Sequence, residues 1–124
     1  RQRQMCIRDS FANFVQCGED TVKCWDALRP YIVYIHIKDA VSTDKENVLC
    51  GTGEGKIPEL LHKAIVEEGY TGFLTLEPHL VLFDSLQSLE TTDAKNIIRE
   101  NKYKNGAEGY AAQYHALCDI LAKF

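Results

Sequence analysis

One short run constrains the fold more than any other part of the chain. Tyr31 to Lys38 reads Tyr-Ile-Val-Tyr-Ile-His-Ile-Lys, with branched or aromatic residues on both faces and polar residues only near the end. That pattern is typical of a strand buried on both sides, as parallel strands are in α/β proteins. A second short run of the same kind covers Thr71 to Glu77. The sequence therefore predicts two parallel strands.

Between these two strands the hydrophobic period changes to that of a helix. Pro58 suits a first helical turn, and Gly69 suits the end of the helix. The apolar stripe consists of Ile57, Leu60, Leu61, Ala64 and Ile65. A helix near Ile57 to Glu68 that joins two parallel strands makes a right-handed βαβ unit, and the fold class predicted is α/β.

Weaker signals complete the order helix, strand, helix, strand, helix. A first helix is predicted at Glu19 to Leu28, because Val22 and Trp25 lie three residues apart and Pro30 would end the helix. Val41 to Lys56 is predicted to be a loop, and Ser85 to Asn105 an irregular segment with a short helix near Ala94 to Glu100. The apolar stripe of a terminal helix consists of Tyr110, Tyr114, Leu117 and Leu121, widened by Ala111, Cys118 and Ala122.

The first ten residues, Arg1 to Ser10, differ from the rest of the chain. They are polar, include three arginines and show no strand or helix period. We predict that residues 1–10 are a non-native or artefactual segment outside the fold, and that residues 11–124 form the domain. The rest of the chain contains no third strong strand signal. Because a two-stranded parallel sheet leaves both edges open, the sequence predicts part of a larger fold.

Composition narrows the choice of partners and compartment. The hydrophobic fraction of 45% and the charged fraction of 26% argue against bulk disorder. A net charge of −4 makes nucleic acid a poor partner, and no run approaches the roughly 18 apolar residues of a membrane span. The five cysteines include no C-x-x-C pair, which favours free thiols in a reducing cytoplasm. We expect a cytoplasmic protein with a small-molecule partner.

Polar residues close both predicted strands. His36 and Lys38 share one face of the first strand, and Thr75 and Glu77 share one face of the second. Ligands of parallel α/β folds lie at the carboxyl ends of strands, where an imidazole and a carboxylate could bind one divalent cation. The structural alternative is that His36 is a hydrogen-bonded core histidine and Glu77 a strand-end cap.

A glycine-rich loop, Gly51-Thr52-Gly53-Glu54-Gly55, precedes the middle helix. Its backbone amides could face a phosphate at the start of that helix. The spacing matches neither the dinucleotide fingerprint nor a P-loop. The alternative is that the glycines simply allow a tight turn between the strand and the helix.

Several motifs in the chain carry a specific resemblance. In order, they are Ala12-Asn13-Phe14, Gly18, Trp25, Leu28, the run from Tyr34 to Ala40, Gly51-x-Gly-Glu-Gly55, Gly69-Tyr-x-Gly-Phe73 and Leu76-Glu-Pro-His-Leu80. This order and spacing resemble the late portion of sugar phosphate isomerase/epimerase proteins, in the xylose isomerase-like TIM barrel superfamily. The resemblance covers roughly Phe11 to Phe124. It implies the C-terminal βα units of a (β/α)8 TIM barrel, and so an incomplete barrel.

The resemblance also implies a metal site. The family takes a glutamate, an aspartate, a histidine and a second glutamate from successive strand ends, and binds a divalent cation such as Mn, Mg, Co or Zn. His36 matches the histidine, and Glu77 matches the last glutamate, which also serves as catalytic acid/base. The aspartate position holds Ser10, and the first glutamate position has no counterpart in the chain. Metal binding by this chain alone should therefore be weak.

Three further residues are predicted near the same mouth. Lys38 would stabilise an anionic or enediolate oxygen, although a salt bridge with a neighbouring acid is an equal alternative. Asn13 and His79 would hydrogen-bond a sugar substrate. Because most of a barrel is absent, we also expect an exposed apolar patch and expect apolar strand residues to be poorly covered, namely Ile35, Ile37, Leu74 and Leu76.

The resemblance implies a metal-dependent sugar (phosphate) isomerase or epimerase that moves a proton next to a carbonyl, with the isolated chain inactive. One alternative is an apurinic endonuclease-like phosphodiesterase of the same superfamily, which needs further histidines after His36. Between Asp39 and Lys56 there is none. The other alternative is a non-catalytic, degenerate barrel fragment.

Overall fold

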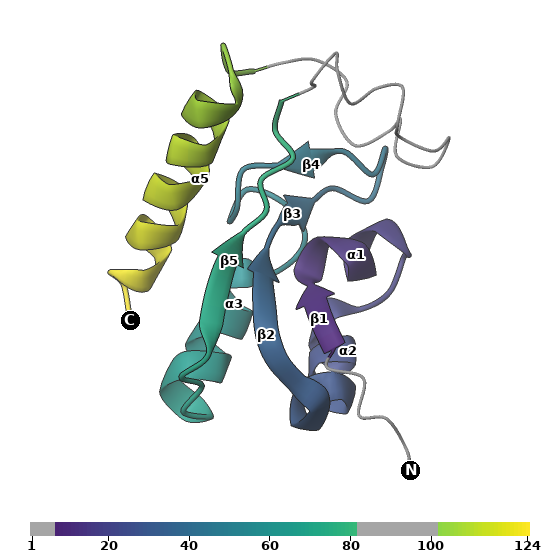
Figure 1. The fold of residues 1–124 in the computed structure, drawn as a ribbon. Helices are drawn as coiled ribbons and strands as arrows, with labels where there is room; N and C mark the ends of the chain where they lie inside the picture. The colour runs from purple at the N-terminus through teal and green to yellow at the C-terminus, as the bar shows by residue number, and fades with distance from the viewer. Residues whose placement is uncertain (1–6, 82–101) are drawn as a thin grey trace.

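Three short strands form a parallel sheet at the centre of the fold (Figure 1). The computed structural model describes residues 7–81 and 102–124 of the chain. The strands are β1 (Ile7–Ser10), β2 (Ile32–Ile37) and β5 (Phe73–Leu76), with β2 in the middle. The predicted α/β class and the parallel pairing of the two predicted strands are confirmed.

Four helices of the described part of the chain pack around this sheet. They are α1 (Phe11–Gln16), α2 (Thr21–Leu28), α3 (Ile57–His62) and α5 (Gly106–Leu121). A π-helical stretch, Lys63–Glu67, continues α3, and a 3₁₀ turn, Arg29–Tyr31, leads from α2 into β2. In Figure 1, α2 and α3 lie behind the sheet and α5 lies beside β5. The helix predicted between β2 and β5 is therefore present.

The core lies between the sheet and these helices. Ile35 is 1% exposed and Ile37 is 0% exposed, so the expectation that they would be poorly covered is wrong. Alternation along a strand turns them toward the helices, which are present. Leu74 and Leu76 are half-buried. The core is formed by Phe11, Trp25, Ile32, Ile35, Ile37, Cys50, Ile57, Leu60, Leu61, Ala64, Leu117 and Ile120.

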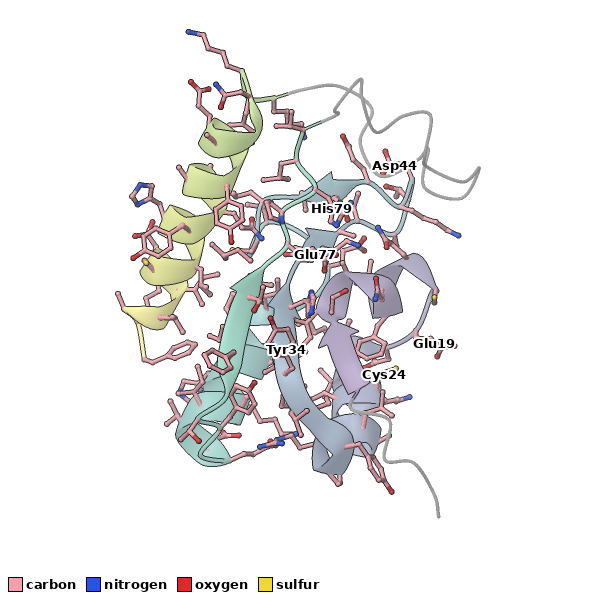
Figure 2. The ribbon with its side chains drawn as sticks, viewed as in Figure 1. Glu19, Cys24, Tyr34, Asp44, Glu77 and His79 are labelled. Carbon is pink, nitrogen blue, oxygen red and sulfur yellow. The ribbon has the colours of Figure 1, made fainter. Side chains whose placement is uncertain are left out.

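The opposite face of the sheet is less covered. Tyr34 and Phe73 are register partners on β2 and β5, and Phe73 is 78% exposed. Figure 2 shows Tyr34 in front of β2, on the side away from α2 and α3. Parallel sheets are usually covered on both faces. Phe73 is therefore an exposed apolar residue on the face of Tyr34.

Strand β1 was not predicted. Ile7–Ser10 pairs with β2 in parallel, with Ser10 opposite His36, so the prediction that residues 1–10 lie outside the fold is wrong for these four. A strand of this kind is held by backbone hydrogen bonds, which need no apolar period in the sequence. Residues 1–6 lie outside the described part of the chain.

A small antiparallel pair, β3 (Asp39–Ala40) and β4 (Asn47–Val48), lies beyond the tip of β2 (Figure 1). It interrupts the loop predicted at Val41 to Lys56. The irregular segment predicted from Ser85 falls mostly within residues 82–101, and its short helix near Ala94 to Glu100 falls wholly within them, outside the described residues.

Helix α5 buries a different face from the one predicted. Tyr110 and Tyr114 are 49% and 54% exposed, so the predicted stripe is wrong at these two positions. The buried residues are Gly109, Gln113, Leu117 and Ile120. Gln113 can be buried because both polar atoms of its amide are paired: the backbone N–H of Cys50 donates to Oε1 at 3.0 Å, and Nε2 donates to the carbonyl of Ile37 at 3.1 Å.

Two further observations concern membrane-spanning helices and the cysteines. Among the described residues, no helix combines the length and apolarity that a membrane crossing requires. Cys17, Cys50 and Cys118 are free thiols, as predicted. Burial raises the pKa of the Cys50 thiol to about 12, so Cys50 is an inert core residue.

Candidate functional site

The carboxyl ends of β2 and β5 bring His36 and Glu77 together. The backbone N–H of Glu77 donates to the carbonyl of Ile37 at 3.1 Å, which extends the parallel pairing one residue past β5. Thr75 is opposite His36, and alternation then places Glu77 on the same face. His36 Nδ1 lies 2.7 Å from Glu77 Oε2. The two residues predicted to share a site are therefore in direct contact.

His79 holds the other oxygen of the same carboxylate. Its Nε2 lies 2.9 Å from Glu77 Oε1. His79 adopts a left-handed backbone conformation, with φ of 44°, which is rare for residues other than glycine and costs free energy. Figure 2 shows His79 and Glu77 next to each other beyond the tips of β2 and β5. A strained backbone here turns an imidazole toward the carboxylate.

Lys38 supplies a cation to this group. It directly follows β2, is 8% exposed, and accepts a hydrogen bond through its carbonyl from the N–H of Ala12 at 3.2 Å. Burial lowers the pKa of Lys38, and the negative charge of Glu77 opposes that change. We refer to His36, Lys38, Glu77 and His79 as the Glu77 cluster.

The carboxylate of Glu77 is stabilised in its charged form. Burial alone would raise its pKa, but the hydrogen bonds from His79 and His36 and the charge of Lys38 together lower it. Its side chain is 38% exposed, so it remains accessible from outside. An accessible, ionised carboxylate with two titratable partners can accept a proton and pass it on.

Asn13 does not join the Glu77 cluster. It lies on α1, directly after β1, and its side chain is exposed. Within the described residues its side chain makes no hydrogen bond, and its carbonyl accepts from the N–H of Cys17 at 3.0 Å. Of the five predicted site residues, four are therefore together, and Asn13 makes no contact with them that the described residues show.

Ser10 is a residue that the sequence prediction excluded with the first ten. It is the last residue of β1, lies opposite His36 and is 3% exposed. Within the described part of the chain its hydroxyl has no hydrogen-bond partner, and neither does Nε2 of His36. The resemblance gave a signal for it, because the aspartate of the implied metal site aligns on Ser10.

The implied divalent metal does not fit the residues present. A hydroxyl stands where the resemblance implies a carboxylate, and one imidazole and one carboxylate remain as donors. Within residues 7–81 and 102–124, no group of three or more His, Cys, Asp or Glu residues could hold a metal ion. Binding of a divalent cation depends on several converging ligands. This set of donors is incomplete.

The glycine-rich loop binds a carboxylate of the protein itself. Asp39 is 1% exposed and accepts four backbone N–H bonds, from Ala40, Gly51, Gly53 and Gly55, at 2.9 to 3.0 Å. Burial raises the pKa of the Asp39 carboxyl, and these four hydrogen bonds oppose the rise. The phosphate-binding interpretation is thus not supported by the structure, because Asp39 occupies these amides.

The glycines of this loop are required by space. A Cβ on Gly53 would lie 2.5 Å from Asp39 Oδ1 and 2.6 Å from the Ala40 carbonyl oxygen, and one on Gly55 would lie 2.7 Å from Asp39 Oδ1. A Cβ atom essentially never comes this close to another heavy atom of a neighbouring residue. The tight-turn interpretation of the loop therefore holds, with Asp39 as the group that it closes on.

Comparisons with known proteins give no relatives. No family model matches the sequence, and no match was found among curated proteins or solved structures. The geometry of the site and the resemblance of the motifs are therefore the basis for a proposal.

Proposed function

We propose that this chain supplies the C-terminal βα units of a TIM-barrel sugar (phosphate) isomerase or epimerase, with Glu77 as the catalytic acid/base. The observation that supports it most is the Glu77 cluster: an ionised carboxylate at the carboxyl ends of parallel strands, held by two imidazoles beside a lysine. Active sites of such barrels are built at this end of the strands.

The proposed chemistry is a proton transfer next to a carbonyl. The Glu77 carboxylate removes the proton from the carbon beside the carbonyl, and the electron pair moves to the carbonyl oxygen. The Lys38 ammonium group faces the negative charge of this enediolate oxygen. For isomerisation, Glu77 then returns the proton to the neighbouring carbon while the hydroxyl proton passes from one oxygen of the enediolate to the other. Epimerisation needs a second carboxyl group, from the rest of the barrel, to deliver a proton to the opposite face of the same carbon. His36 and His79 keep the carboxylate oriented, and keep it ionised until it takes up the proton.

The divalent metal belongs to the complete barrel in this proposal. The chain provides His36 and Glu77 of the implied ligands, and no step above depends on the metal. The less covered sheet face around Tyr34 and Phe73 also belongs to the proposal, because it would be the interior of the barrel. For both reasons we expect the isolated chain to be inactive.

Proton exchange at carbon tests the proposal directly. The longer barrel that contains this sequence would be incubated with a panel of ketoses and inososes in deuterium oxide, with Mn, Mg, Co or Zn added. We expect deuterium to appear at the carbon beside the carbonyl, detected by NMR. Glu77→Gln, which keeps the shape but cannot accept the proton, should reduce exchange at least about a hundredfold.

The matched control is Glu59→Gln, which removes an exposed carboxylate on α3, outside the Glu77 cluster. It should exchange at the wild-type rate. A folded barrel with no exchange on any member of the panel would contradict the proposal and favour a non-catalytic protein. Exchange that survives Glu77→Gln would contradict the assignment of Glu77.

A further inference from the structure

Two buried polar atoms without partners belong to neighbouring residues on adjacent strands of the sheet. Among the described residues, neither the Ser10 hydroxyl nor Nε2 of His36 has a hydrogen-bond partner, and the two residues are register partners on β1 and β2. Register partners on adjacent strands point to the same face. Because buried polar groups are nearly always hydrogen-bonded, two unpaired atoms on neighbouring residues indicate a shared partner that the described residues do not supply.

Local structure does not use the Ser10 hydroxyl. Ser10 directly precedes α1, the position at which a serine normally accepts a hydrogen bond from the first turn of the helix. Here the side chain makes no such bond. Ser10 is 3% exposed, yet its hydroxyl makes no hydrogen bond to the described residues. The Ser10 hydroxyl is therefore available to bind a ligand atom.

The hydrogen bond to Glu77 decides which atom would fit. A carboxylate only accepts hydrogen bonds, so His36 Nδ1 at 2.7 Å carries the proton. In the neutral ring, Nε2 is then an acceptor. The Ser10 hydroxyl can both donate and accept. An O–H group can donate to Nε2 and at the same time accept from Ser10, so it satisfies both atoms, whereas a divalent cation would find no charged ligand at either of them.

We propose that Ser10 and His36 bind the hydroxyl group of an α-hydroxy carbonyl sugar, and a water molecule in its absence, at the place where the resemblance implies a cation. The identity of the sugar rests on the proposed function, but the preference for a hydroxyl group does not. Because His36 would contact both the bound hydroxyl and Glu77, the hydroxyl lies on the sheet face where the substrate carbon would be. Ser10 is then a positioning residue for the substrate.

Long-range proton–nitrogen NMR of the histidine rings tests this on the full chain. We expect His36 to show a protonated Nδ1 and an unprotonated Nε2. Dihydroxyacetone should shift the Nε2 resonance of His36 saturably, whereas acetone, which lacks the hydroxyl groups, should not. Ser10→Ala should move the resonance in the free protein and weaken the response to dihydroxyacetone at least fivefold. Ser10→Cys, which keeps most of the volume, should weaken it too.

The matched control is Thr21→Val. Thr21 is also 3% exposed with an unpaired hydroxyl, but it lies on α2, outside the Glu77 cluster. Its substitution should leave the His36 response unchanged.

Three results would overturn the proposal. The first is a response to dihydroxyacetone that is equal in Ser10→Ala and wild type. The second is a Ser10-dependent Nε2 shift without any response to dihydroxyacetone, which would mean a water site only. The third is loss of the His36 signals with one equivalent of paramagnetic Mn²⁺, which would mean a cation site. Each is read without catalysis, so failure of the proton-exchange assay remains a separate result.

Discussion

Two carboxylates near the carboxyl ends of the strands, Glu77 and Asp39, are held in opposite ways. Asp39 is buried and accepts four backbone N–H groups, which are fixed by the loop and cannot change charge. Glu77 is 38% exposed and is held by His36 and His79, which can change charge. The comparison teaches that partners, not the carboxylate itself, separate a structural acid from one suited to proton transfer.

The largest expected effect concerns the structural acid. Asp39→Ala leaves four backbone N–H groups of a tight loop without their acceptor, and each buried unpaired group costs about 1–3 kcal/mol. We expect a loss of about 3–5 kcal/mol in the free energy of unfolding, measured by urea titration. That is a large share of the total of about 5–15 kcal/mol for a typical domain.

Glu77→Ala is the matched comparison for Asp39→Ala. It should cost about 1 kcal/mol or less, because its partners are side chains that can turn toward water. Equal losses for the two variants would break the distinction between the two carboxylates. Asp39→Asn should fall between them, since its amide keeps one acceptor oxygen.

The glycine loop sharpens the same point with a smaller effect. Gly53 has no left-handed φ, so backbone preference alone would allow alanine there, but the new Cβ would meet Asp39 and Ala40 at 2.5 and 2.6 Å. Gly53→Ala should lower the free energy of unfolding by about 2–3 kcal/mol. Gly18 has φ of +77° with nothing within 4 Å, so Gly18→Ala should cost only about 1 kcal/mol. The reverse order would show that Asp39 does not close this loop.

Which helices and strands could be predicted from the sequence depends on the interactions that stabilise each of them. Period and punctuation were sufficient for β2, α3 and β5, because their apolar faces drive burial. The contact between His36 and Glu77 followed from polar residues at the ends of adjacent parallel strands. Strand β1 could not be predicted in this way, since it is held by backbone hydrogen bonds to β2.

Polar residues account for the other failures. Gln113 is buried on α5 through bonds to Cys50 and Ile37, residues 63 and 76 positions away, while Tyr110 and Tyr114 face outward. No local pattern shows such distant partners. The same holds for Asp39, whose four N–H donors include three glycines 12 to 16 residues later. The unpaired hydroxyl of Ser10 is visible only once its neighbours are placed.

The pH dependence of stability tests the Glu77 side of the comparison. Its folded pKa is lowered below the ordinary value, so its contribution is present above the unfolded pKa and is lost as the pH falls through the folded pKa. Wild-type stability should therefore drop on acidification by up to about 1 kcal/mol from this residue, allowing for solvent screening of a side chain that is 38% exposed.

Glu77→Gln should remove that part of the drop, measured by urea unfolding at a series of pH values below neutrality. Glu59→Gln, which removes an acid outside the Glu77 cluster, is the control for the change in net charge. A pH profile of Glu77→Gln that matches that of Glu59→Gln would mean that His36 and His79 do not stabilise the charged carboxylate.

The smallest expected effect separates backbone strain from hydrogen bonding at His79. Its φ of 44° suits glycine far better than any other residue, and its imidazole is one of the two that hold Glu77. His79→Ala and His79→Gly both remove the hydrogen bond, and only glycine relieves the left-handed conformation. The penalty of about 1–2 kcal/mol for that conformation is partly offset by the greater chain entropy that glycine loses on folding. We therefore expect His79→Gly to be more stable than His79→Ala by about 0.5–1 kcal/mol in urea unfolding.

Both variants should raise the pKa of Glu77 relative to wild type, because a hydrogen bond to the charged form is lost. NMR of the Glu77 carboxyl carbon measures this pKa. Equal stability of the two variants would mean that the backbone at residue 79 relaxes without the imidazole, and an unchanged pKa of Glu77 would mean that His79 is not its partner in solution.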